Sequence, residues 1–386
     1  MKLKIPVNPE NLRWARESAN LPIDDVAGRM NKDPGIIEEW EDGISSPTYI
    51  QLEKLAYEVY KRPIAVFFFP EPPEEISPRT SFRTLPEIEI EQLSPRLLHL
   101  FRQAQAMQAN LRELNDGRNP ADRKIFRDLQ FGPRSNLRSI VETVREYLGV
   151  SLQTQTAWKD TNAALKEWRE VIEANGVFVF KDAFRQDDIF GFCVYDDEFP
   201  VIYINNSTAS AGRQIFTLFH ELTHLLLKTG GIDRDDRTLL RRVAGDSRRI
   251  EILCNQFVGE FLVPASDFDE QVSGSAINDE IVGKLANRYK VSWEVVLRRC
   301  LDKRLISQQY YHAKRQEAIE KAARKRYGTQ GGNYYYNQAL YLGNSYLSLV
   351  FSRYYQGKFP VQQLAEYLNV KVNHIPDLEA VFLGRG

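Results

Sequence analysis

The stretch "FHELTHLLL", residues 219–227, places two of the chain's five histidines four residues apart, with a glutamate directly after the first. Residues four apart on an α-helix lie on the same side, one turn from each other. His220 and His224 can therefore reach one metal ion, and Glu221 shares their side of the helix. Apolar residues surround the motif, so this helix is predicted to be buried, where unpaired imidazoles and carboxylates would cost several kcal/mol.

A zinc ion accounts for this pattern. A catalytic zinc site has three protein ligands and keeps a fourth position for water, whose pKa the metal lowers toward neutrality. Glu221 is then the predicted base that takes the proton of the water. The alternative is a buried core helix that carries two histidines without a metal. The rarity of histidine in this chain and its spacing on an apolar helix favour the metal site.

The third ligand is sought in the helix expected at 248–263, "RRIEILCNQFVGEFLV". Glu251 lies in this apolar segment and needs a partner, and Asn255 follows one turn later on the same face. The alternative for Glu251 is a salt bridge to Arg248 or Arg249. The aspartates nearer to the motif lie in a polar connection and are expected to be solvated: Asp233, Asp235 and Asp236.

Composition limits the class of protein. A length of 386 residues suggests two or three domains, and a net charge of −1 gives no overall field that would recruit nucleic acid or a membrane. The three cysteines are widely spaced, which argues against a disulfide framework and fits a reducing cytoplasm. The first twenty residues contain no apolar core of a signal peptide, and no apolar run is long enough to span a bilayer. We therefore expect a cytoplasmic protein without membrane contact.

Periodicity divides the chain into helical ends and a mixed centre. Residues 8–62 predict four short helices, the last with a buried stripe that begins at Tyr49. A proline-rich linker follows at 67–90. Two helices are expected next, at 91–117 and 134–149, separated by a polar break.

The centre and the C-terminal part have a different pattern. A helix ending at Gly176 precedes three short apolar runs that predict a small sheet, and the helix at 211–228 follows them. From 277 onward the chain is expected to be helical, with a turn at 330–338, "QGGNYYYNQ". The fold class predicted is α+β and mostly helical.

Together, "FHELTHLLL" and "EILCNQFVGEFLVP" resemble the ImmA/IrrE family of metallo-endopeptidases, over about residues 170–270. The resemblance implies a zincin-like core, with His220, His224 and Glu251 as zinc ligands and Glu221 as the base. It also implies a protein substrate, because relatives cut helix-turn-helix repressors. The sequence departs from the family pattern at two small residues, since Thr223 replaces the usual glycine and Cys254 the usual alanine.

Residues 8–62 resemble a Cro/C1-type (XRE) helix-turn-helix domain of the five-helix type, with "DPGIIEEWEDG" as the recognition helix. Such a helix normally enters the major groove of DNA. However, residues 1–62 contain nine Lys/Arg against eleven Asp/Glu, a net charge of −2, and the recognition segment carries Glu38, Glu39, Glu41 and Asp42 and no Lys or Arg. Because phosphate contacts need positive charge, DNA binding is predicted to be weak, and protein docking is the alternative.

The cations that could contact DNA are few. Two lie in the N-terminal module, and the others belong to the most basic helix of the chain, at 312–326. A second chain in a homodimer is a further source of positive charge. The residues assigned to weak DNA binding are Arg29, Lys32, Lys314, Arg315, Arg324, Lys325 and Arg326.

The sequence thus predicts four parts: a helix-turn-helix domain at 1–66, the linker at 67–90, a zinc metallopeptidase domain at 91–305 and a helical region at 306–386. The expected function is a regulatory, zinc-dependent endopeptidase that cleaves a protein substrate, such as a helix-turn-helix repressor or a cognate partner. The alternative is a DNA-binding regulator or the antitoxin of a two-gene module, whose metal site is structural or little used.

Overall fold

The computed structural model describes residues 6–75, 93–207, 210–234, 245–274, 276–326 and 333–385. The chain forms two compact units, Met1–Gln105 and Ala106–Gly386. Helices account for 63% of the residues and accompany one four-stranded sheet, which confirms the predicted α+β, mostly helical class. None of the helices in the described ranges combines the length and the apolar character that a bilayer crossing requires.

The first unit is a bundle of short helices around its own apolar core. Asn8 caps the first helix by accepting a hydrogen bond from the backbone of Glu10 at 3.0 Å, and Thr48 forms a capping box with Gln51 at the fourth. Tyr49 is 56% exposed, so its predicted place in the buried stripe is wrong. The elements are α1 (Pro9–Glu17), α2 (Ile23–Met30), α3 (Pro34–Glu41), α4 (Tyr49–Lys54), a π-helix η1 (Leu55–Tyr60) and a 3-10 helix η2 (Ile64–Phe68).

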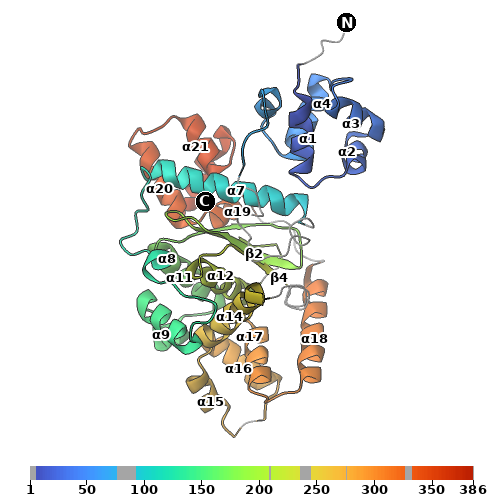
Figure 1. Ribbon diagram of the computed structural model, residues 1–386. Helices are drawn as coiled ribbons and strands as arrows, with labels where there is room; N and C mark the ends of the chain where they lie inside the picture. Colours follow the sequence, from blue (N-terminus) through green and yellow to red (C-terminus); the bar gives the residue numbers. More distant parts are fainter. Residues whose placement is uncertain are drawn as a thin grey trace. The chain divides into compact units, whose positions relative to one another are not determined.

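The second unit surrounds the sheet with helices (Figure 1). Helix α7 (Pro95–Leu114) crosses the boundary between the units, and its last turns belong to the second. The further elements before the metal motif are α8 (Ile125–Asp128), α9 (Leu137–Leu148), α10 (Leu152–Ala157), α11 (Thr161–Ala174), β1 (Phe178–Asp182), β2 (Ile189–Val194) and β3 (Val201–Asn205). Those that follow are α12 (Ala211–Leu226), β4 (Gly231–Arg234), α14 (Gly245–Leu262), α15 (Ala265–Val272), α16 (Asp279–Tyr289), α17 (Trp293–Asp302), α18 (Gln308–Arg326), α19 (Tyr334–Leu342), α20 (Asn344–Tyr355), α21 (Val361–Leu368), η3 (Val372–His374) and α22 (Ile375–Phe382).

The sheet has the strand order β1-β3-β2-β4. β1 and β3 are parallel, whereas β2 runs antiparallel to both of its neighbours. Helix α12 packs against β2, β3 and β4, and α11 and α19 pack against β1. The sheet therefore has helices on both faces, and the helix that carries the metal motif covers its β2–β4 side (Figure 1).

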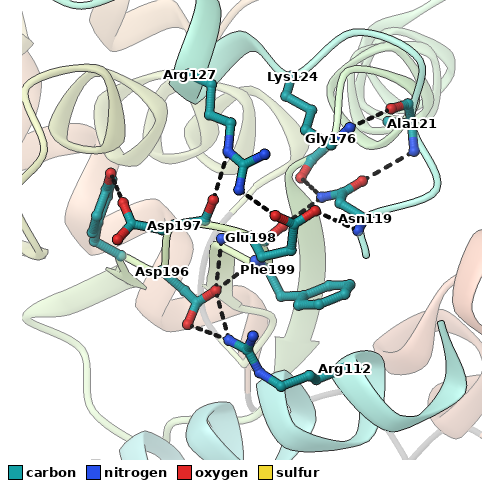
Figure 2. Close-up of polar contacts among 11 residues, drawn as sticks. Arg112, Asn119, Ala121, Lys124, Arg127, Gly176, Asp196, Asp197, Glu198 and Phe199 are labelled. Atoms are coloured by element: carbon teal, nitrogen blue, oxygen red, sulfur yellow. Dashed lines mark hydrogen bonds and ion pairs between the residues drawn. The ribbon is translucent and has the colours of Figure 1, made fainter. Parts of the chain in front are cut away.

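The turn between β2 and β3 is fixed by polar contacts to two other segments (Figure 2). The backbone N–H of Asn119 donates to the carboxylate of Glu198 at 2.6 Å, and the side-chain amide of Asn119 donates to the backbone oxygen of Glu198 at 2.7 Å. Arg127 also pairs with Glu198. From α7, Arg112 pairs with Asp196 at 2.8 Å. These contacts hold the β2–β3 hairpin at the end remote from α12's first turn.

Two elements differ from the sequence expectation. The strand β4 begins at Gly231, where only the end of the preceding helix was predicted. Helix α19 begins at Tyr334, so the part of the expected turn at 330–338 that lies within the described residues is mostly helical. In both places glycines suggested a loop, but contacts with β2 and β1, which are remote in sequence, support regular structure.

Candidate metal centre

Helices α12 and α14 are held against each other by aromatic side chains. The ring of Phe219 lies 4.6 Å from that of Phe261 on α14 and makes an edge-on contact with Trp168 on α11, with 4.8 Å between ring centroids. All three side chains are buried. Because Phe219 directly precedes His220, this packing fixes the rotation of α12 and turns the metal motif toward α14.

The structure brings His220, His224 and Glu251 together. The two Nε2 atoms of the histidines lie 3.2 Å apart. The carboxylate of Glu251 lies 3.5 Å from Nε2 of His220 and 3.4 Å from Nε2 of His224. The side chains of His220, His224 and Glu251 are at most 3% exposed, and that of Glu221 is fully buried. The three residues predicted to share a metal therefore converge on one buried point. Their role as metal ligands stays a prediction.

The far nitrogen of each imidazole has a polar contact. Nδ1 of His220 lies 3.2 Å from Oδ1 of Asn255, and Nδ1 of His224 lies 3.1 Å from Oγ1 of Thr229. With a hydrogen on Nδ1 donated to these oxygens, each Nε2 faces Glu251 and is the nitrogen that would face a bound metal ion. Asn255 thus lies where a residue that orients a metal ligand would lie. Thr229 was missed, and its place five residues after His224, just past the helix end, is the only signal in the sequence.

The two buried carboxylates at the centre have few polar contacts. Oε1 of Glu251 lies only at the long distance of 3.4 Å from Nε2 of His224, and Glu221 has the weak thiol donor of Cys193 beside it. Burial raises the pKa of Glu221, and the nearby imidazoles of His224 and His220 offset only part of this effect. Burial acts in the same direction on Glu251, but the two histidines outweigh it and lower the pKa of Glu251 to about 2. Such a set of nitrogen and oxygen donors fits a divalent cation such as zinc.

The sheet forms the opposite wall of the centre. Gly231 of β4 packs directly on the imidazole of His224, so that a Cβ atom there would lie 2.4 Å from Cδ2 of the ring. Gly191 of β2 packs equally closely on Thr217 of α12. Both glycines are required because the strands approach the helix without room for a side chain.

Asp233 on β4 is 1% exposed, so the expectation that it is solvated is wrong. Its carboxylate pairs with Arg213 at 2.8 Å and accepts a hydrogen bond from the hydroxyl of Thr217 at 2.7 Å. This negative charge, with that of Glu251, raises the pKa of His220 to about 10, against the lowering effect of burial. Asp233 therefore adds a third carboxylate beside the metal motif, held in place by Arg213 and Thr217.

The sequence interpretation also missed Cys254, which it treated as a small replacement for alanine. Ring nitrogens of His220 and His224 and the sulfur of Cys254 all lie within 4.8 Å of one another, and all three residues are buried. Burial raises the pKa of the Cys254 thiol. This group could bind a metal ion, which makes Cys254 a further donor beside Glu251.

The cations assigned to DNA binding belong to both units of the chain. Arg29 and Lys32 are exposed in the first unit. In the second unit, Lys314 pairs with Asp279 at 2.8 Å and Arg315 pairs with Glu294 at 2.7 Å. The side chains of three further cations lie outside the described residues: Arg324, Lys325 and Arg326.

The acidic recognition segment is less acidic at its surface than the sequence suggested. Glu41 is buried and accepts two hydrogen bonds from Arg16, at 2.7 and 2.9 Å. The other acids of the segment are accessible, although Asp42 pairs with Arg13 at 2.6 Å: Asp33, Glu38, Glu39 and Asp42. DNA binding and protein docking both stay predictions for this unit.

A buried His-Glu-x-x-His helix that faces a glutamate on a second helix is typical of metallopeptidase-like proteins. Residues 172–301 match the family model described as the IrrE N-terminal-like domain, a peptidase family. The match runs from the end of α11 to α17 and includes every residue of the metal centre, which supports the resemblance to the ImmA/IrrE family in this region. No curated protein matches the chain.

Proposed function

We propose that this protein is a zinc-dependent endopeptidase with a regulatory role, and that its substrate is a protein. The observation that carries the proposal is the carboxylate of Glu221, which is buried beside two convergent imidazoles and, among the described residues, has only the weak thiol donor of Cys193 as a hydrogen-bond neighbour. A carboxylate left in this state costs free energy unless a ligand or a reaction uses it. The family match over residues 172–301 supports the same class of activity.

His220, His224 and Glu251 would hold the zinc, with Asn255 and Thr229 keeping the imidazoles in orientation. Zinc in such a site polarises a peptide carbonyl and lowers the pKa of water. Glu221 accepts a proton from the water that attacks the peptide carbonyl carbon, and returns it to the nitrogen that leaves. Burial raises the pKa of Glu221, which makes the carboxylate a stronger base for the first step than an exposed carboxylate is.

Glu221→Gln tests the proposal. The amide has the shape of the carboxylate but cannot accept the proton, so cleavage of a proteome-derived peptide library should fall by about 10²- to 10⁴-fold. The zinc content by elemental analysis should not change. Glu170→Gln, an exposed substitution on α11, is the matched control and should keep full activity. Wild-type cleavage by Glu221→Gln would contradict the mechanism.

Metal content separates the ligands independently of activity. His220→Ala and Glu251→Ala should lose most of the one zinc expected per chain, whereas Cys254→Ala should retain it if Glu251 is the third ligand. Full occupancy in Glu251→Ala combined with loss in Cys254→Ala would transfer the ligand role to the thiol.

A second function is favoured by the burial of the centre. His220, His224, Glu251 and Cys254 are each almost fully covered, and the thiol adds a fourth donor of the kind found in structural zinc sites. Such a centre suits a regulator or antitoxin whose metal only supports the fold. In that case Glu221→Gln would leave all functions intact, and zinc removal would unfold the second unit.

A further inference from the structure

A cavity of about 540 Å³ lies in the second unit at the start of α12. Helix α11, the end of β1, the first turn of α12 and helix α19 form its walls. None of the residues of the metal centre lines it. Ligand pockets for small molecules typically measure about 300–1,000 Å³, so the cavity has the size of a binding site.

Lys181, on β1, lines this cavity and is only 6% exposed. No hydrogen bond or ion pair joins its ammonium group to any residue within the described ranges. Burial lowers the pKa of Lys181 to about 7, and the nearby charge of Arg169 adds to this effect. The carboxylate of Glu173 offsets only part of it, because it is paired with Arg169. A buried ammonium group without an ion-pair partner of its own is costly, because it gives up hydration.

The other charged groups around the cavity already have partners. Arg169 pairs with Glu173 at 2.9 Å and donates to the backbone oxygens of Leu340 at 2.8 Å and Leu342 at 3.0 Å. Lys166 lies 3.8 Å from Glu170 at the rim. The acids of this wall are therefore neutralised by their own neighbours, and Lys181 is left as the cation that faces the space.

The turn between α19 and α20 is built around this arrangement. Gly343 has a φ of +84°, and a Cβ atom there would lie 2.0 Å from a guanidinium nitrogen of Arg169. The glycine lets the chain close over Arg169, and α19 then supplies the apolar wall of the cavity. The apolar lining comprises Leu165, Tyr336, Ala339, Leu340 and Val381.

The beginning of α12 supplies a second positive feature. Ala211 and Gln214, in its first turn, line the cavity. The first N–H groups of a helix have no partner within the helix and carry partial positive charge, which favours anions. The helix has 16 residues, and the hydroxyl of its N-cap Ser210 accepts from the backbone N–H of Arg213 at 3.3 Å, so the other N–H groups of the first turn supply the partial charge available to an anion.

We propose that this cavity binds a small organic anion, a carboxylate or a phosphate monoester on a partly apolar body, with the anionic group between Lys181 and the first turn of α12. The anion supplies the counter-charge that the buried ammonium group lacks, and the apolar body lies against α19. The proposal does not depend on the metal centre or on peptidase activity.

Pyridoxal 5′-phosphate is a suitable probe, because it carries both an aldehyde and a phosphate. At pH 7 the neutral amine of Lys181 adds to the aldehyde and the adduct loses water to give an imine. Borohydride then delivers a hydride to the imine carbon, and the nitrogen takes a proton, which leaves a stable secondary amine. Peptide mapping of the full-length protein should show labelling of Lys181 at least about tenfold faster than that of exposed lysines, whose amines are almost fully protonated at this pH.

Competition shows whether the site binds anions. Inorganic phosphate and benzoate should each slow the labelling of Lys181 but not that of exposed lysines. Protection by phosphate alone would identify a phosphate monoester as the ligand class, and protection by benzoate alone would identify a carboxylate. Labelling that neither anion slows, or that is no faster at Lys181 than at the surface, would overturn the proposal.

Variants provide the matched comparison. Lys181→Met should lose the label and the protection, while Lys166→Met, at the exposed rim, should keep both. Lys181→Arg retains the cation but cannot form the imine. If Lys181→Met fails to fold, calorimetric titration of Lys181→Arg with the anion that protects the wild type, phosphate or benzoate, should still give binding within about tenfold of the wild type. Absence of binding of both anions to the wild type and to Lys181→Arg would contradict the assignment.

Discussion

Two buried glutamates, Glu41 in the first unit and Glu221 in the second, show how differently the two regions treat the same side chain. Glu41 is 5% exposed and is paired with Arg16 at 2.7 Å, with Arg13 at 3.9 Å. Glu221 is fully buried, and among the described residues only the weak thiol donor of Cys193 hydrogen-bonds to it, with no arginine or lysine paired to it. An arginine therefore neutralises the first carboxylate, whereas no such cation neutralises the second. The first arrangement stabilises a fold, and the second is the carboxylate to which we assign the role of base in the proposed function.

Removal of Glu41 should have the largest effect on stability. Glu41→Ala leaves the guanidinium of Arg16, which is mostly covered, without its main partner and should destabilise the first unit by about 3 kcal/mol. Hydrogen exchange of peptides from residues 9–60 measures this directly in the full chain. Glu38→Ala, on the exposed side of the same helix, is the control and should change the exchange little. If Glu41→Ala and Glu38→Ala change the exchange equally, the pair of Glu41 with Arg16 does not stabilise the first unit.

At the metal centre of the second unit, a zinc ion should supply the positive charge that Arg16 supplies to Glu41 in the first unit. At a free zinc concentration of 100 times Kd, binding should raise the free energy of unfolding of the second unit by about 2.7 kcal/mol, and a chelator should reverse this. Thermal melts with and without zinc measure the change. Glu251→Ala should abolish the zinc-dependent shift, while Glu41→Ala should keep it. A shift that persists in Glu251→Ala would exclude that carboxylate from the site.

Lys181 extends the comparison to a buried cation. The fold lowers the pKa of Lys181 to about 7, so the unfolded chain binds this proton more tightly and stability should rise as the pH increases from 7 toward 10. Lys181→Met removes the penalty. The variant should be more stable than the wild type by about 2 kcal/mol at pH 6, and the difference should shrink toward pH 10. Urea denaturation at several pH values gives this difference, and a constant gap across the range would contradict the argument.

The smallest effect is expected at the exposed cations of the first unit. Arg29→Ala combined with Lys32→Ala should change the affinity of the full chain for generic duplex DNA by less than about threefold, because the neighbouring acids leave little net charge for counterion release. Fluorescence anisotropy across a salt series measures both affinity and salt dependence. Tight binding with a steep salt slope, lost in the double variant, would assign DNA binding to this unit.

The sequence was sufficient for the helix that carries the motif and for the segment that faces it. Both follow from local information: the spacing of His220 and His224, and an acid at Glu251 within an apolar helix. The four short N-terminal helices follow in the same way from their caps and apolar spacing.

The features that the sequence did not predict depend on contacts remote along the chain. Asp233 is buried because Arg213, twenty residues earlier, neutralises it, and no local pattern distinguishes it from a solvated aspartate. Glu41 is buried for the same reason, through Arg16. Cys254 becomes a possible metal donor only because two histidines of another helix lie close to its sulfur. Pairwise burial of charge is therefore the part of this site that periodicity cannot reveal.

The close contact between Gly231 and the imidazole of His224 has a consequence for protein engineering. A designer who transplants "FHELTHLLL" onto another helix would copy the ligands but not the strand that holds one ring in place. Any side chain at Gly231 would push that imidazole aside, and any side chain at Gly191 would lift the helix at Thr217. The smallest transferable unit is thus the helix together with the two glycine positions of the strands. Substitution of either glycine should disturb the centre without changing any of its proposed ligands.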